Sequence, residues 1–115
     1  MIKKAIQLDP DNGAYLDSLG WVYYRQNKLD EAEEWLRKAL EKVSRDPTVH
    51  DHLGDVYLKQ GKARLAQQQW QRSLQEWELS SQAEINPDEI AKIRKKLDSI
   101  KARAAQESGA ARQQP

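Results

Sequence analysis

Two stretches of this chain repeat one pattern of residues at a spacing of 34 positions. In both copies a Leu-Gly pair is followed three residues later by Tyr and nine residues after that by Ala. The recurring positions are Leu16, Leu19, Gly20, Tyr23, Ala32 and Leu36 in the first copy and His50, Leu53, Gly54, Tyr57, Ala66 and Trp70 in the second. A fixed period of this length indicates a chain built by stacking one supersecondary unit. Because one unit cannot bury its apolar face alone, its neighbours must cover it, and we expect an all-α solenoid.

The composition fits one small domain and excludes several kinds of chemistry. The 115 residues are 38% hydrophobic and 32% charged, which predicts a thin core under a solvated surface. Without any Cys there is no disulfide, thiolate chemistry or Cys-ligated metal. The net charge of +1 gives no general attraction to nucleic acid or membranes, and no apolar run reaches the roughly 18 residues of a membrane span. We therefore expect a soluble protein; the compartment is left open, with the cytoplasm favoured.

Apolar spacing and capping signals divide the chain into helices. Asp30 with Glu33 predicts a capping box, Asp46 and Asn86 each precede a Pro at a helix start, and Gly61 predicts a helix end. The expected segments are the end of a preceding repeat with a short helix and a turn (1–13), a first repeat (14–46), a second repeat (47–80), a linker (81–86), a capping helix (87–107) and a disordered tail (108–115).

Gly20 and Gly54 are expected in the middle of helices, where Gly costs roughly 1 kcal/mol relative to Ala. A cost taken at the same register in both copies needs a structural reason. We expect the paired helix to cross there and leave no room for a Cβ, with Ala32 and Ala66 as the small residues opposite.

The recurring residues resemble the tetratricopeptide repeat family, whose pattern is Trp-x2-Leu-Gly-x2-Tyr, then Ala-x3-Phe, then Ala and Pro. Ala39 extends the match in the first copy, and Ala5 with Pro10 matches the end of a preceding repeat. The resemblance implies two full repeats, a preceding half repeat and a C-terminal capping helix, used as a protein–protein interaction scaffold. The sequence departs from the family at two positions: Pro47 stands later than the family's Pro, and His50 replaces an aromatic residue. His50 predicts either local looseness or an interhelical hydrogen bond.

In this family the first helix of each repeat lines a concave groove that takes a peptide. A helical wheel places one set of residues on this flank or at its margin: Asp17, Trp21, Tyr24, Arg25, Asp51, Asp55, Leu58 and Lys59. This surface is acidic and aromatic, so we expect a basic or apolar protein or peptide partner. The Lys and Asn residues with which chaperone-binding members clamp a carboxylate are missing. The alternative is that Trp21 only packs against the preceding helix or at an interface between copies.

Other functions are weighed against this one. His50 and His52 point about 200° apart on a helix and cannot share a metal ion, so we expect no metal, no cofactor and no enzyme activity.

The last helix carries an apolar seam, formed by Ile90, Ile93, Leu97, Ile100 and Ala104. Residues 87–115 hold seven Lys or Arg against four Asp or Glu. No aromatic residue stands among these cations, so a solvated face is favoured and nucleic-acid contact through Lys92, Arg94, Lys95, Lys96 and Arg103 is a remote alternative.

The half repeat at the start of the chain lacks its first helix. Ile2, Ile6 and one flank of the first full helix would then be left uncovered. The rest of a longer array, a swapped helix or a second copy would have to cover this open end, which predicts possible self-association.

Overall fold

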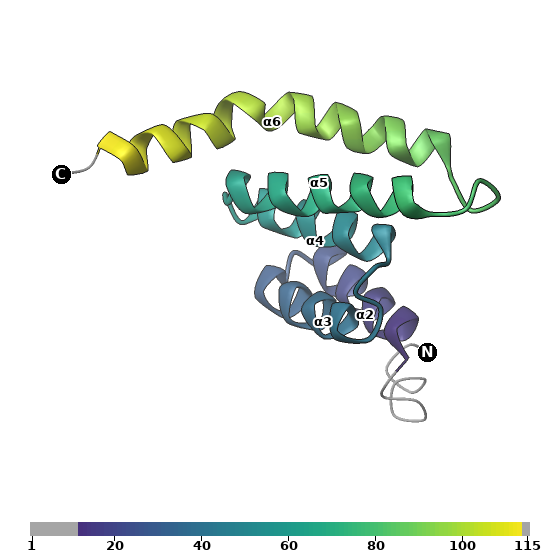
Figure 1. Ribbon diagram of the computed structural model, residues 1–115. Helices are drawn as coiled ribbons and strands as arrows, with labels where there is room; N and C mark the ends of the chain where they lie inside the picture. The colour runs from purple at the N-terminus through teal and green to yellow at the C-terminus, as the bar shows by residue number, and fades with distance from the viewer. Residues whose placement is uncertain (1–11, 114–115) are drawn as a thin grey trace.

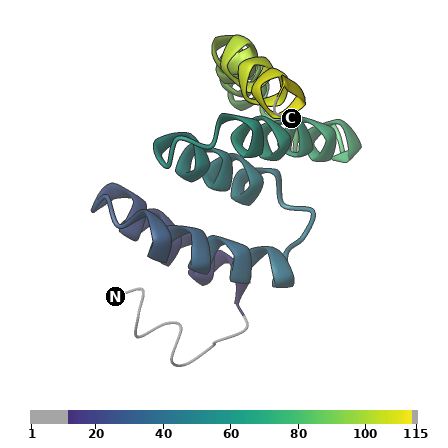
Figure 2. The ribbon, with the colours of Figure 1, turned by 90° about the vertical axis from the view of Figure 1, so that its left-hand side faces the viewer.

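The computed structural model describes residues 12–113, with side chains to residue 107. Within that range two helical hairpins stack on one another and a last helix lies across the second hairpin (Figure 1). Seen from the side, the two hairpins and the last helix form successive layers (Figure 2). The all-α prediction is thereby confirmed; the helix expected at 2–8 lies outside the described residues. The helices are α2 (Gly13–Arg25), α3 (Leu29–Lys42), α4 (Pro47–Lys59), α5 (Ala63–Leu79) and α6 (Pro87–Gln113).

The hairpin turns of both repeats have the same geometry, although their residues differ. Asn27 and Gly61 adopt positive φ angles of 62° and 79°, and each turn closes with an N–H donated to the carbonyl of the repeat's Tyr, at 2.9 Å in both cases. Gly adopts this left-handed conformation freely, and Asn tolerates it better than most residues. The next helix can therefore begin two residues after the left-handed one.

Helix starts follow the sequence signals except at Asp30. Asp46 accepts hydrogen bonds from the backbone of Thr48 (2.9 Å) and Val49, and Asn86 caps α6 in the same way. The capping box predicted at Asp30 is wrong, because the tight turn starts α3 at Leu29 and leaves Asp30 in the first turn. There its carboxylate still favours the helix N-terminus electrostatically.

The two mid-helix glycines lie at close helix crossings, as expected. A Cβ on Gly20 would lie 2.7 Å from Leu36 Cγ and 3.3 Å from the Ala32 carbonyl oxygen, and one on Gly54 would overlap the indole of Trp70. The side chains at the crossing are therefore Leu36 and Trp70, rather than the alanines proposed from the sequence. Both are fully buried.

The remaining residues predicted to pack the repeats also lie in the interior. Most are buried and Tyr23 is partly buried against the core; they are Leu16, Leu19, Ala32, Ala39, Leu53, Tyr57 and Ala66. They belong to the pattern that recurs along the sequence, so the repeat period correctly indicates which residues form the core.

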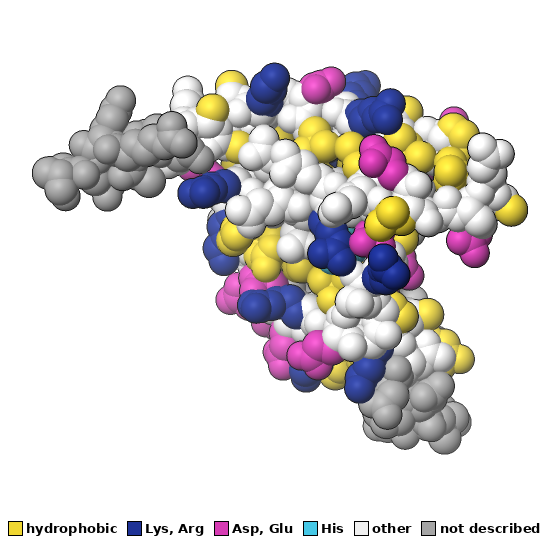
Figure 3. Space-filling view, in the orientation of Figure 1, with side chains coloured by type: hydrophobic (Ala, Val, Ile, Leu, Met, Phe, Trp, Pro, Cys, Tyr) yellow, Lys and Arg dark blue, Asp and Glu magenta, His cyan; other side chains and the backbone are white. Residues whose placement is uncertain are grey.

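The capping helix packs on α5 through the expected seam. Ile93, Ile100 and Ala104 are buried, and Figure 3 shows hydrophobic side chains along the line where α6 meets α5. Glu107 accepts hydrogen bonds from the backbone N–H groups of Ala63 (3.1 Å) and Arg64 (2.6 Å), so α6 supplies the cap of α5.

The backbone of α6 continues to Gln113, so the expected helix end at 107 and the disordered tail from 108 are wrong. Alanines favour the helical state along this stretch, and no Pro interrupts the chain before Pro115. No helix in the described part of the chain is long and apolar enough to cross a membrane.

Candidate peptide-binding face

The structure brings the predicted groove residues together on one face, shared by α2, α4 and α6, which we call the groove face. Its centre is an aromatic stack. The Trp21 ring lies 4.5 Å from Tyr24 on its own helix and 4.1 Å from His52 on α4, measured between ring centroids. Lys59 Nζ lies 4.5 Å from the Tyr24 ring centroid. This stack links α2 to α4, while the larger contact between the two hairpins is that of α3 with α4.

Asp17 belongs to this junction as well. Its carboxylate accepts a hydrogen bond of 2.8 Å from Nδ1 of His52. Burial lowers the pKa of His52, but the hydrogen bond to Asp17 and the negative charges of Asp17, Asp51 and Asp55 outweigh burial and raise the pKa above its usual 6.5. The imidazole is therefore held in its charged form to a higher pH than in a free chain.

His52 was missing from the groove residues predicted by the sequence. It was considered only as a metal ligand, and it lies one residue beyond the flank that the helical wheel selects. Its spacing of 35 residues from Asp17, one more than the repeat period, was a usable signal. That offset places it against the preceding repeat.

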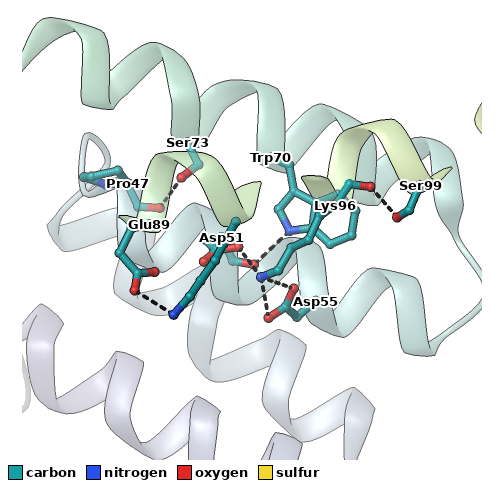
Figure 4. Close-up of polar contacts among 9 residues, drawn as sticks. Pro47, Asp51, Asp55, Trp70, Ser73, Glu89, Lys96 and Ser99 are labelled. Atoms are coloured by element: carbon teal, nitrogen blue, oxygen red, sulfur yellow. Dashed lines mark hydrogen bonds and ion pairs between the residues drawn. The ribbon is translucent and has the colours of Figure 1, made fainter. Parts of the chain in front are cut away.

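The carboxylates of Asp51 and Asp55 are paired with a lysine of the same chain. Lys96 Nζ of α6 donates to Asp51 at 2.9 Å and to Asp55 at 2.9 and 3.2 Å, and it lies 5.7 Å from the Trp70 ring centroid (Figure 4). Burial lowers the pKa of Lys96, but its hydrogen bonds and charge pairing with both carboxylates raise it overall. Burial raises the pKa of Asp55 even beside this ammonium.

These pairings correct the expected charge of the surface. Asp17, Asp51 and Asp55 were expected to attract a basic ligand, yet each carboxylate already has a partner in the fold. Asp17 is paired by His52 of α4, whereas Asp51 and Asp55 are paired from α6, whose position no repeat pattern indicates.

The remaining predicted groove residues differ in their exposure. Leu58 is partly buried against the core, while Arg25 in the last turn of α2 and Lys59 are exposed. Burial raises the pKa of Tyr24, whose ring lies between Trp21 and Lys59.

The two histidines have separate environments. His50 is buried, and its ring nitrogens lie 2.8 Å from the Ser44 carbonyl oxygen and 2.8 Å from Gln69 Oε1 of α5. Of the two expectations for His50, the interhelical hydrogen bond is therefore confirmed. Among the described residues no group of His, Asp and Glu is placed to hold a metal ion.

The hairpins stack on one another, their helices cross closely at the glycines, and one face runs along the first helices. This arrangement defines a helical-repeat solenoid of the kind used for protein–protein interaction. A family model for the TPR repeat matches residues 20–61. The TPR repeat-containing protein PA4667 of Pseudomonas aeruginosa is 51% identical over 55 residues, which make up 48% of this chain and 9% of that protein. The N-terminal domain of stress-induced protein-1 (STI-1) from C. elegans has a similar fold, with a TM-score of 0.62 and 26% identity over 83% of this chain and 75% of that one.

The match over residues 20–61 and the similar fold confirm the resemblance to the tetratricopeptide repeat family that the sequence predicted. The family and the fold support a general role in protein–protein interaction. The match to the Pseudomonas protein covers only 9% of that protein's length.

Proposed function

We propose that the groove face binds a peptide or protein segment through an apolar or aromatic anchor seated on Trp21, Tyr24 and Leu58. The observation that carries this proposal is the Trp21–Tyr24 stack, whose two rings lie side by side and are only partly buried. Partly exposed Trp and Tyr side chains are the residues most often responsible for binding energy at protein interfaces.

Charge plays a smaller part in this proposal than the sequence suggested. A basic ligand would have to compete with Lys96 for Asp51 and Asp55, and an internal ammonium has a large advantage in local concentration. The anchor is therefore apolar, and any basic residue of the ligand contributes less.

The test is a peptide array screened with the purified chain and with two tryptophan variants. Trp21→Ala should weaken the selected peptides by roughly tenfold or more. Trp35→Ala is the matched control, because Trp35 is also partly buried but lies on α3, where Lys38 covers its ring at 4.5 Å. Circular dichroism checks that both variants remain folded. Equal loss of binding in the two variants, or none in either, would reject the groove face as the binding surface.

A second candidate is a structural or self-association module within a larger repeat protein, with no external ligand. The internal pairing of Asp17, Asp51 and Asp55 favours it, because a surface that satisfies its own charges needs no partner for them. Under this reading no array peptide binds and Trp21→Ala lowers only the stability. Light scattering at rising protein concentration tests the expected self-association through the N-terminal end, which lies outside the described residues.

Nucleic-acid contact through α6 remains the remote alternative. Two of the five cations proposed for this contact are engaged, since Lys96 bonds Asp51 and Asp55 and Lys92 lies 3.5 Å from Glu89. A binding constant that falls steeply with salt would favour this alternative over the groove.

A further inference from the structure

His52 lies between the two repeats and contacts both polar and aromatic groups of α2. Its Nδ1 lies 2.8 Å from Asp17, and its ring lies 4.1 Å from that of Trp21, with an interplanar angle of 24°. Both contacts run between α2 and α4. One imidazole therefore links Trp21 and Asp17 of the first repeat to the second repeat.

The charged groups around His52 come from three helices. Asp17 faces it from α2, Asp51 and Asp55 belong to its own helix α4, and Lys96 of α6 bonds both of the latter carboxylates. Lys96 neutralises much of the charge of Asp51 and Asp55, so Asp17 is the direct partner of the imidazole. The side chains of His52 and Asp17 are only 21% and 16% exposed, which limits screening by solvent.

Protonation changes both contacts in the same direction. A neutral imidazole can donate Nδ1–H to the Asp17 carboxylate, and an imidazolium adds the attraction between two opposite charges to the same hydrogen bond. A positive ring stacked on Trp21 also gains a cation–π attraction that a neutral ring lacks. The link between α2 and α4 is thus strongest when His52 is charged.

We infer that His52 is the positioning residue for Trp21, and that its protonation state controls how firmly Trp21 is held on the groove face. The consequence for binding rests on the proposed function: the groove face is better preorganised for its ligand at lower pH. The positioning itself is a property of the free chain and needs no ligand.

The experiment is an NMR titration of the ¹⁵N-labelled chain between about pH 5.5 and pH 9, following the His52 ring protons and the Trp21 indole N–H. We expect both signals to move with one midpoint, above that of an ordinary imidazole. Above this midpoint, protection of the Trp21 indole N–H from exchange, relative to that of Trp35, should fall about fivefold, since the charge attraction to Asp17 and the cation–π attraction to Trp21 are lost.

Two variants separate positioning from simple loss of structure. In His52→Gln the amide can still hydrogen-bond Asp17 but cannot be charged, so the Trp21 signal should no longer titrate. In Asp17→Asn, which leaves the imidazole in place, the shared midpoint should fall for His52 and Trp21 together. His50 is the internal reference, because it bonds Ser44 and Gln69 and should be unaffected by either change.

A Trp21 signal that stays constant while His52 titrates, or that still titrates in His52→Gln, would overturn the inference. So would a His52 midpoint at or below the ordinary value. These outcomes leave the peptide array untouched. Conversely, an array without bound peptides rejects the proposed function but leaves the titration intact.

Discussion

The two hairpins place equivalent residues at the same backbone positions, but different side chains fill the contacts between their helices. In the first, Gly20 faces the flexible side chain of Leu36, and the aromatic surface of Trp21 and Tyr24 stays partly open. In the second, Gly54 faces the rigid indole of Trp70, and the corresponding surface is covered by Lys96 from α6. The repeat thus determines the path of the chain, while single side chains determine which face remains available.

The largest difference should appear when each large crossing residue is removed. Trp70→Ala should cost about 4 kcal/mol and Leu36→Ala about 3 kcal/mol of unfolding free energy, because both side chains are fully buried and leave cavities. Trp70 also loses the hydrogen bond that its Nε1 donates to the Asp51 carbonyl at 3.2 Å. Urea unfolding monitored by circular dichroism measures both values. A cost for Leu36→Ala that exceeds the cost for Trp70→Ala would contradict this ranking of the two cores.

Substitution of the two glycines, which lie on the helices opposite Leu36 and Trp70, tests the same comparison between the hairpins. Gly54→Ala should destabilise the chain by about 3 kcal/mol and Gly20→Ala by about 1 kcal/mol. The indole beside Gly54 cannot move without displacing the core, whereas Leu36 can change rotamer. Improved helix propensity returns up to roughly 1 kcal/mol in each case. Thermal unfolding of both variants checks the prediction, and equal melting temperatures would show that Trp70 yields as easily as Leu36.

Removing Lys96 should make the second repeat resemble the open first one. Lys96→Met keeps most of the packing of the long side chain but leaves Asp51 and Asp55 mostly buried without a cation, which should cost about 1–2 kcal/mol. Because the Lys96 side chain is 33% exposed, this cost is smaller than that of breaking a fully buried ion pair. Lys95→Met on the neighbouring exposed position is the matched control in urea unfolding. The freed carboxylates should also raise the affinity of Lys-containing peptides in the array.

The smallest effect concerns the junction of the repeats and depends on pH. The folded-state pKa of His52 is raised above 6.5, so its contribution to stability is complete below about pH 6.5 and is lost as the pH rises through the folded-state pKa. The stability difference between the wild type and His52→Gln should therefore shrink between pH 6 and pH 9. Urea unfolding at several pH values measures it. A difference that grows with pH would mean that burial, rather than Asp17, dominates the environment of His52.

Local signals predicted much of the fold, and their failures have physical causes. Asp46, Asn86 and Gly61 act within a few residues of themselves, so their roles could be recognised from the sequence. Asp30 was assigned as a cap because nothing local showed that Asn27 would take the left-handed conformation and start α3 earlier. The tail from 108 was expected to lack structure because it has no apolar stripe, yet the helical backbone continues to Gln113.

The groove face could be predicted only in part. The wheel placed Trp21 and Tyr24 on one flank of α2, and the structure stacks their rings. It did not predict that Lys96 pairs with Asp51, because the two residues lie 45 positions apart and no periodic pattern connects them.

The sequence by itself determined the repeated hairpin, its glycine crossings and its main helix starts, because these follow from contacts at a fixed period or within one turn. The tertiary structure alone decided that Lys96 pairs with Asp51 and Asp55, that Glu107 caps α5, and that His52 joins Asp17 and Trp21. These pairings depend on where α6 and the neighbouring repeat are placed in space. Electrostatic and stacking energies follow the distances between such groups, and the order of residues does not specify those distances.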